Sequence, residues 1–91
     1  LGNEIGASMD KTDILMAQNA RTFALENNKI NSKAAWKNPD SGNSGVIYPT
    51  RTYTSGDQPC REFTQEINIG GTIQTGYGTA CRMADGSWDI Q

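Results

Sequence analysis

Two adjacent glycines, Gly70 and Gly71, stand midway between the chain's two cysteines, Cys60 and Cys81, and no other feature constrains the fold as strongly. If the glycines are the two loop residues of a tight β-hairpin, residues equally far from them face each other, so the cysteines form a cross-strand pair. Counting outward from the turn places them on a non-hydrogen-bonded pair, where Cα atoms are about 4.5 Å apart. Two buried thiols are the alternative, but this separation lies within disulfide reach, so we predict a disulfide.

The same register sorts the side chains of the hairpin onto two faces of a sheet. One face joins large apolar side chains to small residues, namely Phe63, Ile67, Ile69, Gly76, Gly78 and Ala80. We assign this face to a helix, because the glycines leave room for a large ring. The opposite face carries the disulfide and is polar, with Tyr77 and Ile73 as exceptions.

A single helix is predicted upstream of the hairpin, over residues 11–26. Asp10 is a suitable N-cap, and Asp13 stands at the third helical position, where a carboxylate meets unpaired amides. Asn27 and Asn28 tolerate a left-handed backbone and are expected to end the helix. An apolar stripe with helical spacing indicates the packing side, and it consists of Met16, Ala20, Phe23 and Ala24, extended upstream by Met9 and Asp13.

The remainder of the chain alternates strand-forming segments with turn-forming ones. The expected strands are residues 34–37, 46–53, 60–69, 72–83 and 87–90. Pro49 cannot donate a ladder hydrogen bond, so its strand, or the side on which it lies, should be an edge. Because short loops pair each strand with its sequence neighbour, we predict an α+β fold. One N-terminal helix packs on a single four- to five-stranded antiparallel meander sheet.

The last turn decides on which face the C-terminal strand places its side chains. A three-residue loop over residues 84–86, with Gly86 in the left-handed region, puts Trp88 and Ile90 on the helix face. A two-residue turn of Asp85 and Gly86 would send both side chains to the polar face. Burial of two large apolar side chains favours the longer loop.

Length and composition exclude several classes of function. The 91 residues suffice for one small domain. With Lys+Arg 8 against Asp+Glu 10, the chain has no basic surface for a nucleic-acid backbone, so no nucleic-acid partner is expected. It contains no histidine, which removes imidazole bases, catalytic triads and most zinc sites, and a disulfide removes both thiols. We predict a protein that is not an enzyme and uses no metal and no cofactor.

Two arginines beside the predicted disulfide are candidate binding residues. Arg61 and Arg82 could present a docking pair to an anionic glycan or a lipid headgroup. The alternative is that their stems cover apolar surface while their charged groups pair with Glu62 or Asp89. Aromatic side chains are further candidates for a ligand or partner surface, namely Trp36, Tyr48, Tyr53 and Tyr77.

Five short words occur in a characteristic order along the chain. They are WKNPDSG from Trp36, SGV from Ser44, CREF from Cys60, GTACR from Gly78 and DGSW from Asp85. Together they resemble the C-terminal domain of the rickettsial-type 17 kDa surface antigen family. The resemblance covers nearly everything from Lys11 onward, and the ordered set is far more specific than any single word in it.

The resemblance implies where such a domain is found. Members of that family are exported lipoproteins with a signal peptide, an acylated cysteine, a glycine zipper and then this domain. Residues 1–9, with Gly2 and Gly6, would be the end of the zipper or a tail, and residues 10–91 the domain, so we read the chain as part of a longer protein. We expect a non-catalytic cell-envelope domain with a structural or binding role, located at the outer membrane or in the periplasm.

The same resemblance bears on the partners of the domain. The membrane would be reached through a lipid anchor and zipper that lie mostly outside this chain. The expected partner is an envelope protein or a second copy in a homodimer, because a sheet covered on one side leaves a face and an edge free.

One alternative function comes from the segment Ser44-Gly45-Val46-Ile47-Tyr48. It matches the S-G-x-x-Y loop of small periplasmic lysozyme inhibitors, in which a Ser and a Tyr enter the cleft of the enzyme. This hypothesis requires Ser44 and Tyr48 to lie on a protruding loop. Those inhibitors are all-β barrels, whereas this chain has a predicted helix.

Overall fold

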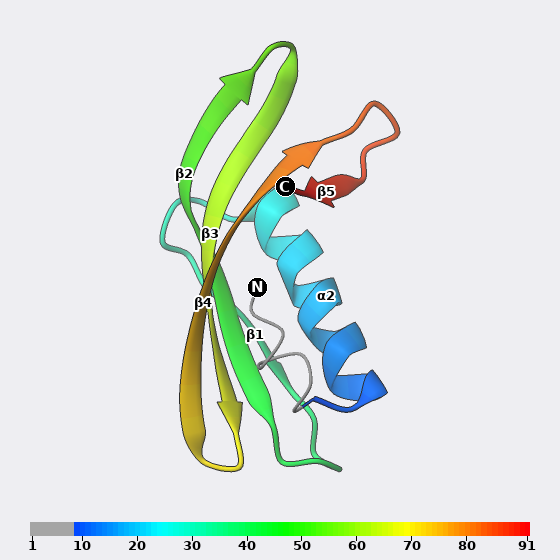
Figure 1. Ribbon diagram of the computed structural model, residues 1–91, viewed down its shortest axis with the longest axis vertical. Coiled ribbons are helices and arrows are strands. Elements are labelled where there is room, and N and C mark those ends of the chain that lie inside the picture. Colours follow the sequence, from blue (N-terminus) through cyan, green and yellow to red (C-terminus); the bar gives the residue numbers. More distant parts are fainter. Residues whose placement is uncertain (1–8) are drawn as a thin grey trace.

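The protein folds as one helix on one five-stranded antiparallel sheet, as the computed structural model describes it over residues 9–91 (Figure 1). The elements in chain order are α2 (Lys11–Asn27), β1 (Ala34–Lys37), β2 (Ser44–Ser55), β3 (Gln58–Ile69), β4 (Thr72–Arg82) and β5 (Trp88–Ile90). The strands lie in sequence order, which confirms the predicted α+β meander. Apart from Met9, the predicted zipper end or tail lies outside the described residues.

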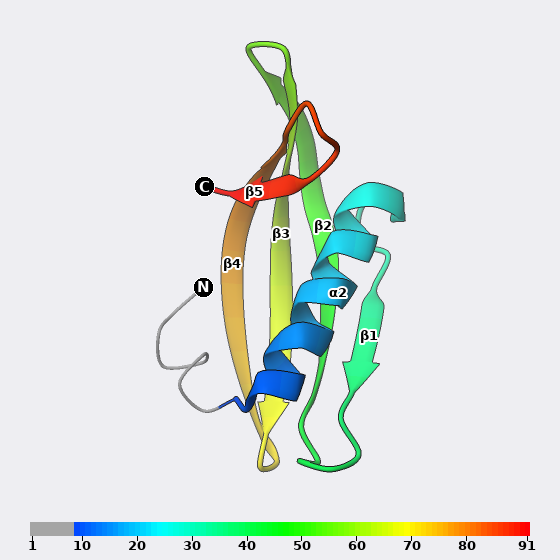
Figure 2. The same ribbon diagram turned by 90° about the vertical axis from the view of Figure 1, so that its right-hand side faces the viewer.

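The helix α2 lies along the concave side of the curled sheet (Figures 1 and 2). Its buried apolar residues are Ala17, Ala20, Ala24 and Leu25, and they pack on Trp36, Ile47, Phe63 and Ile67 of the sheet. Alanines let the helix backbone come close to the strands, so the large rings of the sheet fill the space between the two layers. The predicted contact of the helix with Phe63 and Ile67 is confirmed.

Two details of the predicted helix are wrong. Phe23 is 58% exposed, whereas Leu25 is 2% exposed, because the helix rests on its alanine-rich side and turns Phe23 toward the flank near β1. The helix does not end in a left-handed residue either. Asn28 is extended (φ -89, ψ 143), and the left-handed residue is Asn31 (φ 66), because the chain turns back toward β1 only after it has left the helix.

The hairpin register predicted from the paired glycines is confirmed along its whole length. Gly70 and Gly71 both have positive φ, and the Cα partners run from Ile69↔Thr72 to Cys60↔Cys81. A Cβ atom on Gly78 would lie 2.5 Å from Cζ of Phe63, so the close approach of this ring requires glycine. The last turn has the predicted register, since Gly86 has φ 90 and Trp88 pairs with Arg82, but the expected burial fails for Ile90, which is 38% exposed.

Pro49 lies in a strand that is interior to the sheet, but the side on which Pro49 lies is an edge, so the second of the two expected arrangements is confirmed. β2 has β1 on one side and β3 on the other, but β1 pairs only with residues 44–47. Pro49 therefore lies beyond the end of β1. On that side the carbonyl of Pro49 accepts a hydrogen bond from the backbone N–H of Asn31. No strand lies there that would need a hydrogen bond from the backbone nitrogen of Pro49, which carries no hydrogen. The register shifts between Pro49 and Arg51.

Candidate functional site

The disulfide joins Cys60 of β3 to Cys81 of β4, as predicted. The Cα atoms are 4.0 Å apart, and the two residues are 0% and 5% exposed. The bond lies at the end of the hairpin away from the glycine turn, in the region where β5 begins. It therefore ties together the two strands that carry Arg61 and Arg82.

Arg61 is bound to the C-terminal end of the helix. Its Nη1 donates to the carbonyls of Ala24 (3.2 Å) and Leu25 (2.8 Å), and its Nε donates to Oγ1 of Thr52 (2.9 Å). These carbonyls belong to the last turn of α2, where a cation is favourable, and that of Ala24 also accepts from the amide of the C-cap residue Asn28 at 3.0 Å. Partial burial lowers the pKa of the guanidinium from its usual value, but the group stays charged.

Arg82 holds the same end of the helix from β4. Its Nε and Nη2 donate to the two carboxylate oxygens of Glu26, each at 3.1 Å, and Nε1 of Trp88 donates to Glu26 at 2.7 Å. The hydrogen bonds from Arg82 and Trp88 lower the pKa of Glu26. The alternative of pairing with Glu62 or Asp89 is wrong in its partners, because Arg61 binds the helix carbonyls and Arg82 binds Glu26, while Glu62 pairs with Arg51 at 2.9 Å.

The opposite end of the helix is held by Asp13, which sequence reasoning placed on the packing side without finding partners for it. The carboxylate is fully buried and accepts hydrogen bonds from Nδ2 of Asn38, Oγ of Ser41, Nδ2 of Asn43 and the amide of Asp10, at 2.7 to 3.1 Å. Burial acts to raise the pKa of Asp13, but these donors outweigh it and lower the pKa to about 2. Two features of the sequence could have predicted these partners: Asp13 is an acidic residue within an apolar stripe, and a later turn is rich in Asn and Ser.

Ser44 and Tyr48 lie within β2, between β1 and β3, and not on a loop. The protruding Ser44–Tyr48 loop that the lysozyme-inhibitor hypothesis requires is therefore absent, because β3 pairs with this whole segment and β1 pairs with residues 44–47. Tyr48 has the ammonium group of Lys33 5.6 Å from its ring centroid. The lysozyme-inhibitor hypothesis loses the geometry that it required.

Tyr77 is 74% exposed on the face of the sheet opposite the helix. Tyr77 and Tyr48 are the two neighbours of Thr64 on β3, so they lie on the same face on either side of one strand. Trp36 is 9% exposed and belongs to the core. The predicted site residues thus fall into two groups, the disulfide with its arginines near the end of the helix and the tyrosines on the outer face.

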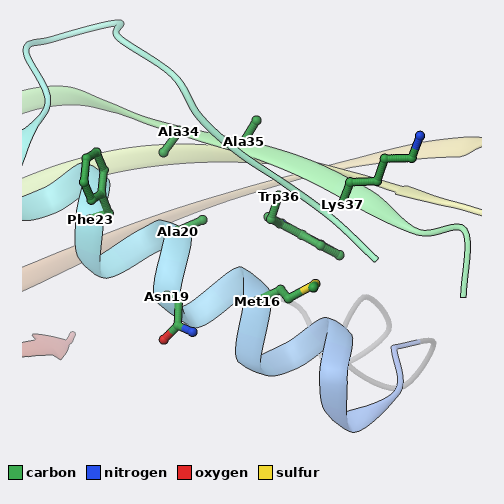
Figure 3. A pocket seen from close by; sticks show the side chains of 8 residues that line it. All are labelled: Met16, Asn19, Ala20, Phe23, Ala34, Ala35, Trp36 and Lys37. Atoms are coloured by element: carbon green, nitrogen blue, oxygen red, sulfur yellow. The ribbon is translucent and has the colours of Figure 1, made fainter. Parts of the chain in front are cut away.

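Hollows on the surface of the described part of the chain lie beside α2 and beside β2. A groove of about 440 Å³ runs between α2 and β1 and is lined by Met16, Asn19, Ala20, Phe23, Ala34, Ala35, Trp36 and Lys37 (Figure 3). A smaller one, of about 240 Å³, is lined by Lys33, Ser44, Gly45, Val46, Glu66, Asn68 and Ile73. Among residues 9–91, no three His, Cys, Asp or Glu side chains are grouped as metal ligands. The one described helix is too short and too polar to span a membrane.

Comparison with known proteins places the chain among surface antigens. Residues 23–89 match the family model described as 17 kDa outer membrane surface antigen. The 17 kDa surface antigen of Rickettsia bellii is 45% identical over 89 residues, which cover 97% of this chain and 56% of the relative. That of Rickettsia japonica is 46% identical over 85 residues (92% and 54%), and that of Rickettsia rickettsii is 46% identical over 83 residues (90% and 52%).

The chain spans about half the length of these relatives. No solved structure matches it. The family match extends over most of the helix-and-sheet domain, so the chain belongs to the 17 kDa outer membrane surface antigen family, as its sequence words indicated.

Proposed function

We propose that this member of the 17 kDa surface antigen family is a non-catalytic domain of an exported outer-membrane lipoprotein, where it has a structural or binding role. The buried disulfide between Cys60 and Cys81 carries this proposal. Disulfides of this kind form and persist in oxidising compartments outside the cytoplasm. The names of the relatives, which are surface antigens, support the same location.

The charged side chains of the site already have hydrogen-bond partners within the domain, which supports a non-catalytic role. Arg61 and Arg82 bind the C-terminal end of α2, and the carboxylate of Asp13 is saturated with donors at the other end. A catalytic acid, base or nucleophile must have a proton or lone pair free to meet a substrate. These groups instead hold the helix on the sheet, so the domain would act by contacts with another envelope protein or with a second copy.

Cell fractionation of the full-length protein tests the location and the anchor. We expect the wild-type protein in the outer-membrane fraction, and a variant lacking the acylated cysteine upstream of this domain in the soluble periplasmic fraction. Alkylation of the thiols before and after reduction reports whether Cys60 and Cys81 are joined in the cell. Free thiols in freshly isolated protein, or the same fractionation for both variants, would overturn the proposal.

Cross-linking in intact cells tests the contact role. The acylated protein should give a discrete cross-linked species with another envelope protein or with itself. The matched control is the soluble variant without the acyl group, which should give less of that species because it is no longer concentrated at the membrane. If neither protein gives a discrete species, the binding role fails and a purely structural one is left.

A further inference from the structure

The outer edge of β1 and the groove beside it form a surface that none of the contacts above uses. β1 pairs with β2 on one side, and no strand among residues 9–91 pairs with its other side. An edge strand of this kind offers unpaired backbone donors and acceptors. Figure 3 shows the groove between this strand and α2, with Phe23 and Met16 on the helix facing Ala34 and Trp36.

We propose that β1 binds an extended segment of a partner protein, which adds to the sheet as a sixth strand and has acidic residues at both ends of an alternating apolar core. In this mode of recognition the backbone gives affinity, and alternate side chains give specificity. The inference rests on the proposed binding role.

The apolar positions of the segment follow from the inner side of β1. Ala34 and Trp36 face the helix, since they pair with Ile47 and Gly45 on the core side of β2. Alternate residues of an added strand would lie beside them and point toward the groove. Phe23, which is 58% exposed, and Met16 would be covered by these side chains. The inward residues of the segment should therefore be apolar.

The acidic positions follow from the outer side of β1. Lys33 precedes the strand and Lys37 ends it, and both are exposed. Alternation along the strand places them opposite to Ala34 and Trp36, although Lys37 also lines one end of the groove. The ion pairs of the described residues involve neither lysine, and the ammonium group of Lys33 lies beside the ring of Tyr48, 5.6 Å from the ring centroid. Opposite charges directly across neighbouring strands attract, so a segment of five residues in register would place a carboxylate beside each lysine.

The same two lysines disfavour a second copy of this chain as the occupant. If two β1 strands paired over their full length, lysines would face lysines in either direction. Like charges directly opposite each other destabilise a strand pair, and edge lysines commonly prevent edge-to-edge association. The charge pattern thus selects a partner of opposite sign.

Peptide titration tests the proposal with the full 91-residue chain. The probe is a fluorescent peptide with the core Glu-Val-Thr-Val-Glu, and its charge-reversed control has Lys at both ends. We expect the acidic peptide to bind about tenfold more tightly at low salt, and Lys37→Glu to remove that preference. Lys11→Glu is the matched control, since it changes the net charge equally at the start of the helix and should leave the preference intact.

Two further measurements separate strand addition from simple adhesion to the groove. N-methylation of alternate peptide amides on one edge should abolish binding, and on the other edge should leave it unchanged. Phe23→Ser should weaken binding without loss of thermal stability, because this side chain is exposed. The proposal is wrong if both peptides bind equally or not at all, or if the wild-type chain dimerises through β1. Because the titration uses no membrane, its failure is distinguishable from a failure of the fractionation test.

Discussion

The two ends of α2 are attached to the sheet by different physical means. At the N-terminal end, the buried carboxylate of Asp13 accepts four hydrogen bonds, all from uncharged donors. At the C-terminal end, Glu26 lies in solvent and pairs with Arg82 and Trp88. The first attachment is a polar network around a buried carboxylate. The second combines the hydrogen bonds of Arg61 to helix carbonyls with an ion pair between Glu26 and Arg82, whose side chains are 41% and 40% exposed.

The comparison shows that similar numbers of hydrogen bonds do not imply similar contributions to stability. When a buried network loses one member, the buried donors that remain, here the amides of Asn38 and Asn43, keep no partner. When an exposed pair loses one member, water replaces it and salt already screens it. We therefore expect the fold to depend on Asp13 far more than on Glu26.

Removal of the buried carboxylate of Asp13 should have the largest effect on the free energy of unfolding. Asp13→Ala leaves the amides of Asn38 and Asn43 and the hydroxyl of Ser41 without their acceptor, and should reduce the free energy of unfolding by about 3–5 kcal/mol. Urea denaturation monitored by circular dichroism measures the loss. Asp10→Ala is the control, since it removes only the N-cap side chain and should cost about 1 kcal/mol. Equal losses in the two variants would refute the importance of the buried network.

Loss of the disulfide should weaken the sheet near the C-terminal end of the helix. The bond closes a sequence separation of 21 residues, so replacing both Cys60 and Cys81 by alanine should destabilise the protein by about 3 kcal/mol. Thermal unfolding of this variant, compared with the wild type before and after reduction, gives the measurement. The reduced wild type should resemble the variant, and the fold should persist under mild conditions because the core and the Asp13 network remain.

Acid should act on the N-terminal attachment. The pKa of Asp13 is lowered from 3.8 to about 2, so its contribution is complete above pH 3.8 and is lost as the pH falls through about 2. The loss should amount to about 2 kcal/mol, and Asp13→Ala should lack this component. Urea titrations of both proteins at pH 5 and pH 2 provide the comparison. Identical pH dependence in the two proteins would show that Asp13 does not titrate at this depressed pKa.

The smallest effect is expected at the exposed end of the helix. Glu26→Gln keeps an acceptor for Trp88 but removes the charge opposite Arg82, so the urea midpoint should fall only slightly at low salt. At high salt the difference from the wild type should disappear, because the ion pair is screened there. A large loss that persists at high salt would mean that this end is held as firmly as the end at Asp13.

The sequence by itself determined the parts of this protein that depend on neighbouring residues. The glycine turn fixes which residues of β3 and β4 face each other, and side-chain alternation then pairs Cys60 with Cys81. The helix start at Asp10 and the last turn at Gly86 follow from equally local capping and turn chemistry. The five short sequence words also indicated the family, which the match over residues 23–89 confirms.

Only the tertiary structure decided where the helix lies on the sheet, and with it the partners of the charged groups. The contacts of Asp13 with Asn38 and Asn43 join residues 25 and 30 positions apart, and Arg82 meets Glu26 across 56 positions. Such pairs depend on the angle and depth at which α2 packs, which no local pattern specifies. The exposure of Phe23 has the same origin, because helical spacing fits several packing sides and the close approach of the alanines selects one of them.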